Sequence, residues 1–205
     1  MKKISRKTIA RVFLYIRTLD GLIREKKHIV SSSELARITG LSDVNIRKDI
    51  SNFGKVGTPR VGYNILELKN MLEDFVLQDN IVHVVLFGVG NLGAAILKYP
   101  AFQRDKIKIV AAFDSDPGKI EQKINGVLVY APGKVAFVIK KTNASIGIIA
   151  VPKEKAQEVA DIAIRSGLKG IINFAPTSIN VPKKVIVKDI DLTIELLSLF
   201  HDSHM

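Results

Sequence analysis

Residues 81–97 read IVHVVLFGVGNLGAAIL. The first seven residues are an apolar run rich in Val and Ile, which is typical of a buried strand. Gly88-Val89-Gly90-Asn91-Leu92-Gly93 follows at once, and Leu92–Leu97 predicts the start of a helix. A glycine pattern of this kind is short and common. Between a strand and a helix, however, it is typical of a loop that holds the pyrophosphate of a dinucleotide.

Each glycine has a physical role in such a loop. Gly88 permits the tight turn, Gly90 lets backbone N–H groups approach the phosphates, and Gly93 lets helix and strand pack closely. The helix N-terminus adds partial positive charge. Asp114 follows the next apolar run, 107–113, and comes 21 residues after Gly93. A carboxylate there accepts hydrogen bonds from a ribose 2′-hydroxyl and repels a 2′-phosphate, so the sequence predicts NAD(H) rather than NADP(H).

Beyond Asp114 the chain alternates apolar runs with helical patterns. Further strands are expected at 127–130, 145–151, 169–174 and 185–187, and helices at 132–141, 153–166 and 191–200. Apolar runs without polar alternation predict a parallel sheet covered on both faces, in a Rossmann-like α/β fold with its ligand at the carboxyl ends of the strands. Ala150-Val151-Pro152 and Asn173-Phe174 end two strands, so we expect them to line the cofactor cleft. The prolines alone fit ordinary strand ends as well as they fit a cofactor cleft.

Composition sets further bounds. The 205 residues are 47% hydrophobic, which is typical of a globular protein, and no apolar stretch reaches the roughly 18 residues that a membrane helix needs. The chain has no cysteine, which excludes disulfides, thiolate metal sites and cysteine-based redox sensing. Arg11 and Arg17 interrupt the apolar stretch behind the basic start, which argues against a secretory signal. We therefore expect a cytoplasmic protein with no membrane partner.

The positive charge is concentrated in the first sixty residues. The net charge is +11, and residues 1–60 hold 14 Lys and Arg against 5 Asp and Glu. Residues 61–80 hold 1 against 4, and residues 81–205 hold 16 against 11. A basic segment of this kind indicates an anionic polymer as the partner.

The same basic segment has helix-turn-helix spacing. Apolar residues recur at helical intervals over 5–24 and predict an amphipathic helix. A capping box at 31–34 predicts a short helix in which Glu34 reaches back to Ser31. Thr39-Gly40-Leu41 predicts a turn, and Ser42 begins a second helix that runs to about Phe53.

The second helix offers side chains for reading DNA. Ile46 and Ile50 are expected to face the core. The residues left outside, and proposed to contact DNA, are Asn45, Arg47, Lys48 and Ser51. Asn and Arg pair with base edges, while Lys and Ser bind phosphates. The alternative for these residues is a solvated basic helix face.

Glycines, a proline and two cations at 54–63 predict a β-hairpin wing. Lys55 and Arg60 would contact the phosphate backbone or a narrow minor groove. An amphipathic helix at 65–78 would follow. The sequence thus predicts a winged-helix DNA-binding domain over 1–78 and a Rossmann-like NAD(H)-binding domain over 79–205, which ends in a C-terminal helix.

No side chain stands out as a catalytic acid or base. His28 lies in the basic segment, His83 interrupts a strand, and His201 and His204 lie at the tail. No metal site is expected, and no separate substrate domain is evident. We therefore interpret the chain as a ligand-controlled transcription factor rather than an enzyme. The alternatives are an NAD-dependent oxidoreductase with a basic accessory domain, a DNA-binding protein with a vestigial nucleotide fold, and a CoA-binding protein, which Asp114 disfavours.

Several motifs in chain order resemble the Rex family of redox-sensing transcriptional repressors. The matching motifs are Arg47-Lys48-Asp49, Phe53-Gly54, Val61-Gly62-Tyr63, Gly88–Gly93, Tyr99-Pro100, Phe113-Asp114, Val151-Pro152 and Asn173-Phe174-Ala175-Pro176. They span nearly the whole chain. The resemblance implies a homodimer that binds operator DNA, senses the balance of NADH and NAD⁺, and is released by NADH.

The same resemblance has structural implications. It implies that the C-terminal helix is exchanged between the subunits of the dimer. It also implies that Arg17, Tyr99 and Asp191 lie near the junction between the domains, where an Arg17–Asp191 pair would exist in only one state of the switch.

Overall fold

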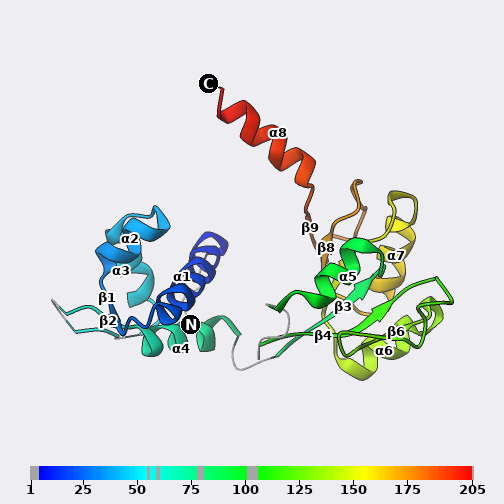
Figure 1. The fold of residues 1–205 in the computed structure, drawn as a ribbon, viewed down its shortest axis with the longest axis horizontal. Helices are drawn as coiled ribbons and strands as arrows, with labels where there is room; N and C mark the ends of the chain where they lie inside the picture. The colour runs from blue at the N-terminus through cyan, green and yellow to red at the C-terminus, as the bar shows by residue number, and fades with distance from the viewer. Residues whose placement is uncertain (1–4, 55, 59–60, 78–80, 101–105, 205) are drawn as a thin grey trace. The chain divides into compact units, whose positions relative to one another are not determined.

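The computed structural model describes residues 5–54, 56–58, 61–77, 81–100 and 106–204. The chain divides into two compact units, 1–80 and 81–205, and Figure 1 labels most of their helices and strands. Within the described ranges, every helix is too short or too polar to span a lipid bilayer.

In its described residues, the first unit consists of four helices and a two-stranded sheet. Its elements are α1 (Arg6–Arg24), β1 (Ile29–Val30), α2 (Ser32–Thr39), α3 (Asp43–Ser51), β2 (Tyr63–Asn64) and α4 (Ile65–Leu77). β1 and β2 pair antiparallel. Each helix contributes fully buried apolar side chains to one core, with Leu19 from α1, Leu35 from α2, Ile46 from α3 and Leu68 from α4 as examples. The expected helix-turn-helix arrangement of α2 and α3 is present.

The helix starts in this unit follow the serine pattern of the sequence. Ser31 Oγ accepts the backbone N–H of Glu34 at 3.0 Å, and Ser42 Oγ caps α3 in the same way. The other half of the predicted capping box is wrong, because the Glu34 carboxylate accepts a hydrogen bond from Lys27 Nζ at 2.7 Å instead. The nearby ammonium is a stronger partner for a carboxylate than a backbone amide. α3 also ends two residues earlier than predicted.

The wing was expected in the segment between α3 and β2. Thr58 and Gly62 form an antiparallel bridge, with the Thr58 N–H donating to the Gly62 carbonyl at 2.9 Å. Gly62 has a φ of +115°, and a Cβ there would lie 2.6 Å from the Val30 carbonyl oxygen, so only glycine fits against β1. Lys55 and Arg60, the predicted wing cations, lie outside the described residues.

The second unit is a seven-stranded sheet with helices. Its elements are β3 (Val82–Phe87), α5 (Asn91–Lys98), β4 (Ile107–Phe113), β5 (Lys123–Ile124), β6 (Val127–Tyr130), the 3₁₀ turn η2 (Pro132–Lys134), α6 (Val135–Thr142), β7 (Ile146–Ile149), α7 (Lys153–Arg165), β8 (Gly170–Asn173), β9 (Ile186–Asp189) and α8 (Leu192–Asp202). The strand order is β5-β6-β4-β3-β7-β8-β9, and every pairing except β5–β6 is parallel.

Alternate residues of β3 pack on opposite faces of this sheet. Val85 and Phe87 belong to the core formed with α6 and α7, whereas Val84 and Leu86 belong to the core formed with α5. The predicted parallel sheet with helices on both faces is therefore confirmed.

The main differences from expectation in the second unit concern β5, α6 and β7, while β8, β9, α7 and α8 differ only in their end residues. The antiparallel strand β5 was not predicted, because two residues that include a lysine give no apolar run. The helix expected at 132–141 is a 3₁₀ turn followed by α6, and the strand expected at 145–151 is shortened to β7.

His83, which interrupts the apolar run of β3, makes a structural hydrogen bond through Nδ1 to the Thr142 carbonyl at 2.5 Å.

Candidate functional site

The register of the central strands brings three chain segments together at one edge of the sheet. Phe87, the last residue of β3, pairs with Phe113 of β4 and with Ile149 of β7. The residues that follow, Gly88, Asp114 and Ala150, therefore meet at the carboxyl edge. This is where parallel α/β sheets bind their ligands.

The glycine loop between β3 and α5 has the geometry that its sequence predicts. Gly88 has a φ of +89°, and a Cβ there would lie 2.5 Å from the Ala150 carbonyl oxygen. A Cβ on Gly93 would overlap the Gly88 carbonyl oxygen. A Cβ on Gly90, by contrast, would meet nothing within 4 Å. Gly88 and Gly93 are thus required by the protein's own packing, while Gly90 keeps space open for a ligand.

The N-terminus of α5 is available to an anion. Gly90 is its N-cap residue and provides no side-chain acceptor for the first-turn amides. Asn91 and Leu92 in that turn are exposed. Uncapped amides and the helix dipole together favour a bound phosphate, as predicted for a dinucleotide loop.

Asp114 is tied to the glycine loop. Its Oδ2 accepts the Val89 N–H at 2.7 Å, and its Oδ1 accepts the Asp116 N–H at 2.9 Å. Lys119 Nζ lies 3.4 Å from Oδ2. Burial alone would raise the pKa of Asp114, but the two backbone N–H groups and the Lys119 ammonium outweigh it, so the pKa lies below its usual value. The carboxylate is thus ionised at neutral pH.

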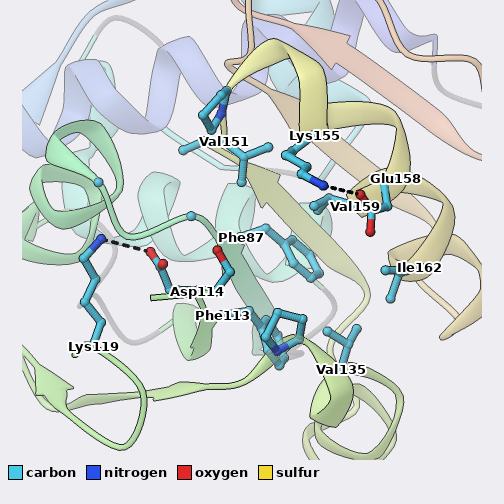
Figure 2. Close-up of a pocket in the computed structure, with 16 residues that line it drawn as sticks. Phe87, Phe113, Asp114, Lys119, Val135, Val151, Lys155, Glu158, Val159 and Ile162 are labelled. Atoms are coloured by element: carbon cyan, nitrogen blue, oxygen red, sulfur yellow. Dashed lines mark hydrogen bonds and ion pairs between the residues drawn. The ribbon is translucent and has the colours of Figure 1, made fainter. Parts of the chain in front are cut away.

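A cavity of about 390 Å³ opens beside this loop (Figure 2). Aromatic and aliphatic side chains from four elements form its walls, namely Phe87, Phe113, Val135, Val159 and Ile162. The predicted site residues that line it are Gly88, Gly90, Asp114, Ala150, Val151 and Pro152. The apolar walls suit a flat heterocycle such as adenine, and Asp114 offers a carboxylate that can accept hydrogen bonds from a ribose hydroxyl. The residues present therefore fit a dinucleotide.

Asn173 and Phe174 do not line this cavity. Asn173 is fully buried, and its amide group donates to the Thr177 carbonyl and to Asp189 Oδ1, both at 2.7 Å. Its carbonyl oxygen accepts the Ala175 N–H at 3.0 Å. These bonds hold the ends of β8 and β9 together. A contact of Asn173 or Phe174 with the cofactor stays a prediction.

Sequence reasoning missed the face of α7 that borders the cavity. Lys155, Glu158, Val159 and Ile162 recur there at helical spacing, and Lys155 Nζ lies 3.0 Å from Glu158 Oε2. The periodicity was readable, because these positions form one stripe of a helix that begins directly after Pro152. Lys119 was missed for a different reason, since it lies in a loop without regular spacing.

We predict that Asp114→Asn weakens the preference for NADH over NADPH. The variant keeps a hydrogen-bond acceptor but loses the charge that repels a 2′-phosphate, so the ratio of the two dissociation constants should fall about tenfold, or about 1.4 kcal/mol. Calorimetric titration with each cofactor measures it. Asp116→Asn is the matched control, because Asp116 also lies within 4 Å of Lys119 but does not line the cavity. An unchanged ratio in Asp114→Asn would assign the preference elsewhere.

The second candidate site is on α3. All four predicted DNA-contacting residues of this helix, Asn45, Arg47, Lys48 and Ser51, are exposed. Arg47 Nη1 lies 2.7 Å from Asp43 Oδ2 and donates to Ser32 Oγ at 3.3 Å. Arg47 also borders a polar groove of about 410 Å³ whose other walls include Ser31 of the α2 start and Thr58 of the wing. α2, α3 and the wing thus form one surface with a half-exposed guanidinium.

The three predicted switch residues are on separate elements. Arg17 is exposed on α1 of the first unit, while Tyr99 and Asp191 belong to the second. Tyr99 follows α5 and is 57% exposed. Asp191 is the N-cap of α8, where Oδ1 accepts the Thr193 N–H at 2.8 Å. An Arg17–Asp191 pair stays a prediction.

Known families match both halves of the chain. The family described as "Putative DNA-binding protein N-terminus" matches residues 3–51, and the family described as "CoA binding domain" matches residues 79–177. The second match accords with the CoA-binding alternative at the level of the shared fold.

Whole-length relatives are more specific. The redox-sensing transcriptional repressor Rex of Carboxydothermus hydrogenoformans is 43% identical over 95% of this chain and 93% of the relative. The repressor of the same name from Limosilactobacillus reuteri is 38% identical over 98% and 94%.

Solved structures give the same result. The chain resembles RSP, a Rex-family repressor, in a complex with β-NAD⁺ and operator DNA, with a TM-score of 0.86, 33% identity and coverage of 98% of this chain and 93% of that one. The complex of RSP with β-NADH gives a TM-score of 0.84 at the same identity, with 98% and 95% covered. On the strength of these whole-chain similarities, this protein belongs to the Rex family of redox-sensing transcriptional repressors.

Proposed function

We propose that this protein binds operator DNA as a homodimer and leaves it when NADH rises relative to NAD⁺. The observation that carries the proposal is the presence of two fitted sites on one chain. The carboxyl edge of β3, β4 and β7 fits a dinucleotide, and α3 presents amide, guanidinium and ammonium groups to solvent. Membership of the Rex family supports the connection between them.

In this proposal α3 enters the major groove. Arg47 and Asn45 are the side chains suited to base edges, and Lys48 and Ser51 to phosphates. A dimer would place two copies of α3 on half-sites about 34 Å apart, or one turn of DNA. The ligand acts by favouring a dimer arrangement that no longer matches this spacing.

The nucleotide site would hold NAD(H) through three parts of the second unit. The α5 amides bind the pyrophosphate, Asp114 binds a ribose hydroxyl, and the apolar walls hold adenine. The dinucleotide supplies a ring whose charge differs between its oxidised and reduced forms. We propose that the chain reads this difference without catalysing hydride transfer, and that it acts in the cytoplasm, where NAD(H) and DNA are both accessible.

We propose that α8 forms part of the dimer contact. Six of its large apolar side chains are more than 60% exposed, namely Leu192, Ile194, Leu196, Leu197, Leu199 and Phe200. A helix with this much exposed apolar surface needs a covering partner. The exchange of C-terminal helices between subunits accounts for it. Sedimentation velocity of the full chain tests this step, and a monomer at micromolar concentration would contradict it.

We expect Asp191→Asn to weaken the NADH response. Asparagine is as good an N-cap as aspartate, so α8 keeps its start while the charge proposed to pair with Arg17 is lost. Asp191→Ala would confuse the two effects, because it also removes the cap. The concentration of NADH that releases DNA should change several-fold. If release by NADH is the same as in the unaltered protein, Asp191 has no part in the switch.

One titration tests the function as a whole. The DNA is the duplex that the protein enriches from a random-sequence library, labelled with fluorescein, and the signal is fluorescence anisotropy. NADH should release the duplex at concentrations where NAD⁺ leaves it bound. Equal effects of the two cofactors would contradict a redox response, and loss of NADH absorbance during the titration would indicate an oxidoreductase.

A further inference from the structure

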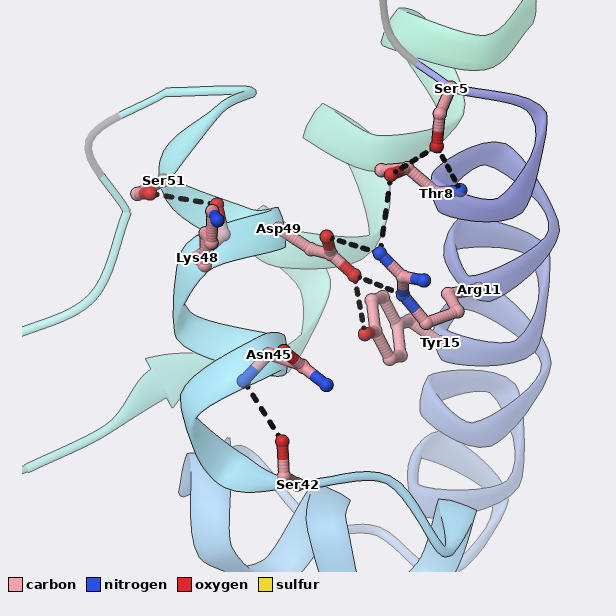
Figure 3. Close-up of polar contacts among 9 residues, drawn as sticks. All are labelled: Ser5, Thr8, Arg11, Tyr15, Ser42, Asn45, Lys48, Asp49 and Ser51. Atoms are coloured by element: carbon pink, nitrogen blue, oxygen red, sulfur yellow. Dashed lines mark hydrogen bonds and ion pairs between the residues drawn. The ribbon is translucent and has the colours of Figure 1, made fainter.

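Asp49 is a buried carboxylate in the middle of α3. Its exposed fraction is 4%, and among the described residues only Asn173 is another buried polar side chain. Two residues of α1 bind it (Figure 3). Arg11 donates through Nε to Oδ2 at 2.6 Å and through Nη2 to Oδ1 at 2.8 Å, and the Tyr15 hydroxyl donates to Oδ2 at 2.9 Å.

Arg11 is itself held in place by the first turns of α1. Its Nη2 donates to Thr8 Oγ1 at 3.2 Å, and Thr8 Oγ1 lies 3.0 Å from Oγ of Ser5, the N-cap residue of the helix. Arg11 and Tyr15 are four residues apart, so they lie on the same face of α1. Asp49 is therefore bound by the Arg11 guanidinium, whose orientation is fixed by Thr8, and by the buried hydroxyl group of Tyr15.

The Asp49 network is not explained by stability alone. Burial by itself would raise the pKa of Asp49, but the hydrogen bonds from Arg11 and Tyr15 outweigh it, and the pKa lies below its usual value. The group is thus an ion pair at neutral pH, in which the carboxylate is buried and the guanidinium is partly exposed. Replacing such a pair with apolar residues of similar volume is often neutral or stabilising. The pair does fix the orientation of α3 relative to α1, because a bidentate guanidinium–carboxylate contact tolerates little rotation.

The rotation of α3 about its own axis determines where its outer side chains point. At 100° per residue, Arg47 and Ser51 lie on the side of α3 opposite to Asp49. Ile46 and Ile50 pack α3 against the core. Apolar contacts, however, restrict the rotation of a helix less than the two hydrogen bonds between Arg11 and Asp49 do. A rotation of about 20° moves a side-chain tip, about 6 Å from the helix axis, by about 2 Å. That displacement exceeds what a hydrogen bond to a base edge tolerates.

We propose that Arg11 and Tyr15 are positioning residues for DNA recognition, which hold α3 at the rotation that aims Arg47 at the bases. The inference rests on the proposed function, because it presumes that α3 reads an operator. Arg11 and Tyr15 need not contact DNA. They act through Asp49, and their loss should reduce sequence preference more than affinity for DNA in general.

The test separates preference from stability. The double variant Arg11→Met/Asp49→Leu replaces the ion pair with apolar side chains, and Tyr15→Phe removes one hydroxyl while keeping the buried ring. Asp20→Asn is the matched control, because Asp20 is an acidic residue of the same helix, α1, that pairs with Lys69 of α4. For each full-length protein, the dissociation constants are measured for the enriched duplex and for a scrambled duplex of equal length and composition. Thermal unfolding is followed in parallel.

The double variant should lose about tenfold in preference for the enriched duplex, which is the scale of one well-formed base contact. Its affinity for the scrambled duplex should change less than about twofold, because the phosphate contacts remain. Its unfolding midpoint should stay within about 5 °C of the unaltered protein. Tyr15→Phe should lose about threefold in preference, at the lower end of the net contribution of one hydrogen bond, because Arg11 still holds Asp49. Asp20→Asn should lose none.

If Tyr15→Phe and the double variant both keep the full preference for the enriched duplex, the inference is overturned and the proposed function stays intact. If the double variant does not fold, Tyr15→Phe alone decides, and a preference equal to that of Asp20→Asn overturns the inference. An unaltered protein that shows no preference for any duplex would overturn the proposed function first and this inference with it.

Discussion

The Gly93→Ala variant is expected to stay on operator DNA at NADH concentrations that release the unaltered protein. A methyl group at this position would overlap the Gly88 carbonyl oxygen, so α5 must move away from the glycine loop. The amides that would bind the pyrophosphate move with it. The dissociation constant for NADH should rise at least about 100-fold, or about 2.8 kcal/mol. Overpacking of this kind also destabilises a fold by about 1–3 kcal/mol, which should appear as a lower unfolding midpoint.

Gly90→Ala separates ligand space from fold integrity. Its methyl group would meet no protein atom within 4 Å, but Gly90 borders the cavity. This variant should lower the unfolding midpoint by no more than a few degrees, because alanine is a poorer N-cap than glycine by about 1 kcal/mol or less, and still bind NADH about tenfold more weakly, or by about 1.4 kcal/mol. Gly133→Ala is the control, since Gly133 is equally open and does not line the cavity. Calorimetric titration and thermal unfolding provide both numbers. Normal NADH binding by Gly90→Ala would mean that the phosphates do not approach this residue.

The second large effect is expected at Arg47. Arg47→Ala should lose about 1–3 kcal/mol of preference for the enriched duplex, because a guanidinium paired with a guanine edge is the most discriminating contact available to α3. Arg47→Lys keeps the charge but not the planar fork, so it should lose a similar preference while keeping more of the general affinity. A similar loss of sequence preference in the two variants would show that the shape of the guanidinium group, rather than its charge, recognises the base.

Anisotropy titrations at several salt concentrations measure both properties of the Arg47 variants. Lys48→Ala provides the contrast, because loss of a phosphate contact should weaken all duplexes alike and reduce the salt slope by about 1. Arg24→Ala, which removes an exposed cation at the end of α1, controls for net charge. Full sequence preference in both Arg47 variants would show that α3 reads the operator through other side chains.

The central strands of the sheet were predictable because they are largely buried between helices on both faces. Such strands are continuous apolar runs, and residues 107–113 match β4 at both ends. The loop between β3 and α5 was equally readable, because contacts within the fold require glycine at Gly88 and Gly93. Helix ends were off by one or two residues, since the last turn depends on capping contacts that the pattern does not show.

Long-range polar contacts were not predictable in the same way. Arg11 and Asp49 are 38 residues apart, and nothing local specifies their pairing. One signal was present, because Asp49 follows Ile46 by three residues and so occupies the inner stripe of the helix. A charge in that stripe requires a buried partner. For Asn173 the local pattern was misleading. Its position at a strand end suggested a contact with a ligand, but its side-chain amide is hydrogen-bonded to Thr177, Ala175 and Asp189 within the fold.

The glycine loop is shaped by the protein's own strands and carbonyl groups. A loop held in this way requires little ordering on binding and contributes the same affinity to both forms of the dinucleotide, so any difference between NADH and NAD⁺ must arise at the nicotinamide end. In the proposed function, that shared affinity shifts nothing by itself, because only a difference between the two forms moves the equilibrium. Its effect is to keep the site filled. When two competitors fill every site, occupancy follows their ratio and not their sum, and the protein becomes insensitive to the size of the total NAD pool.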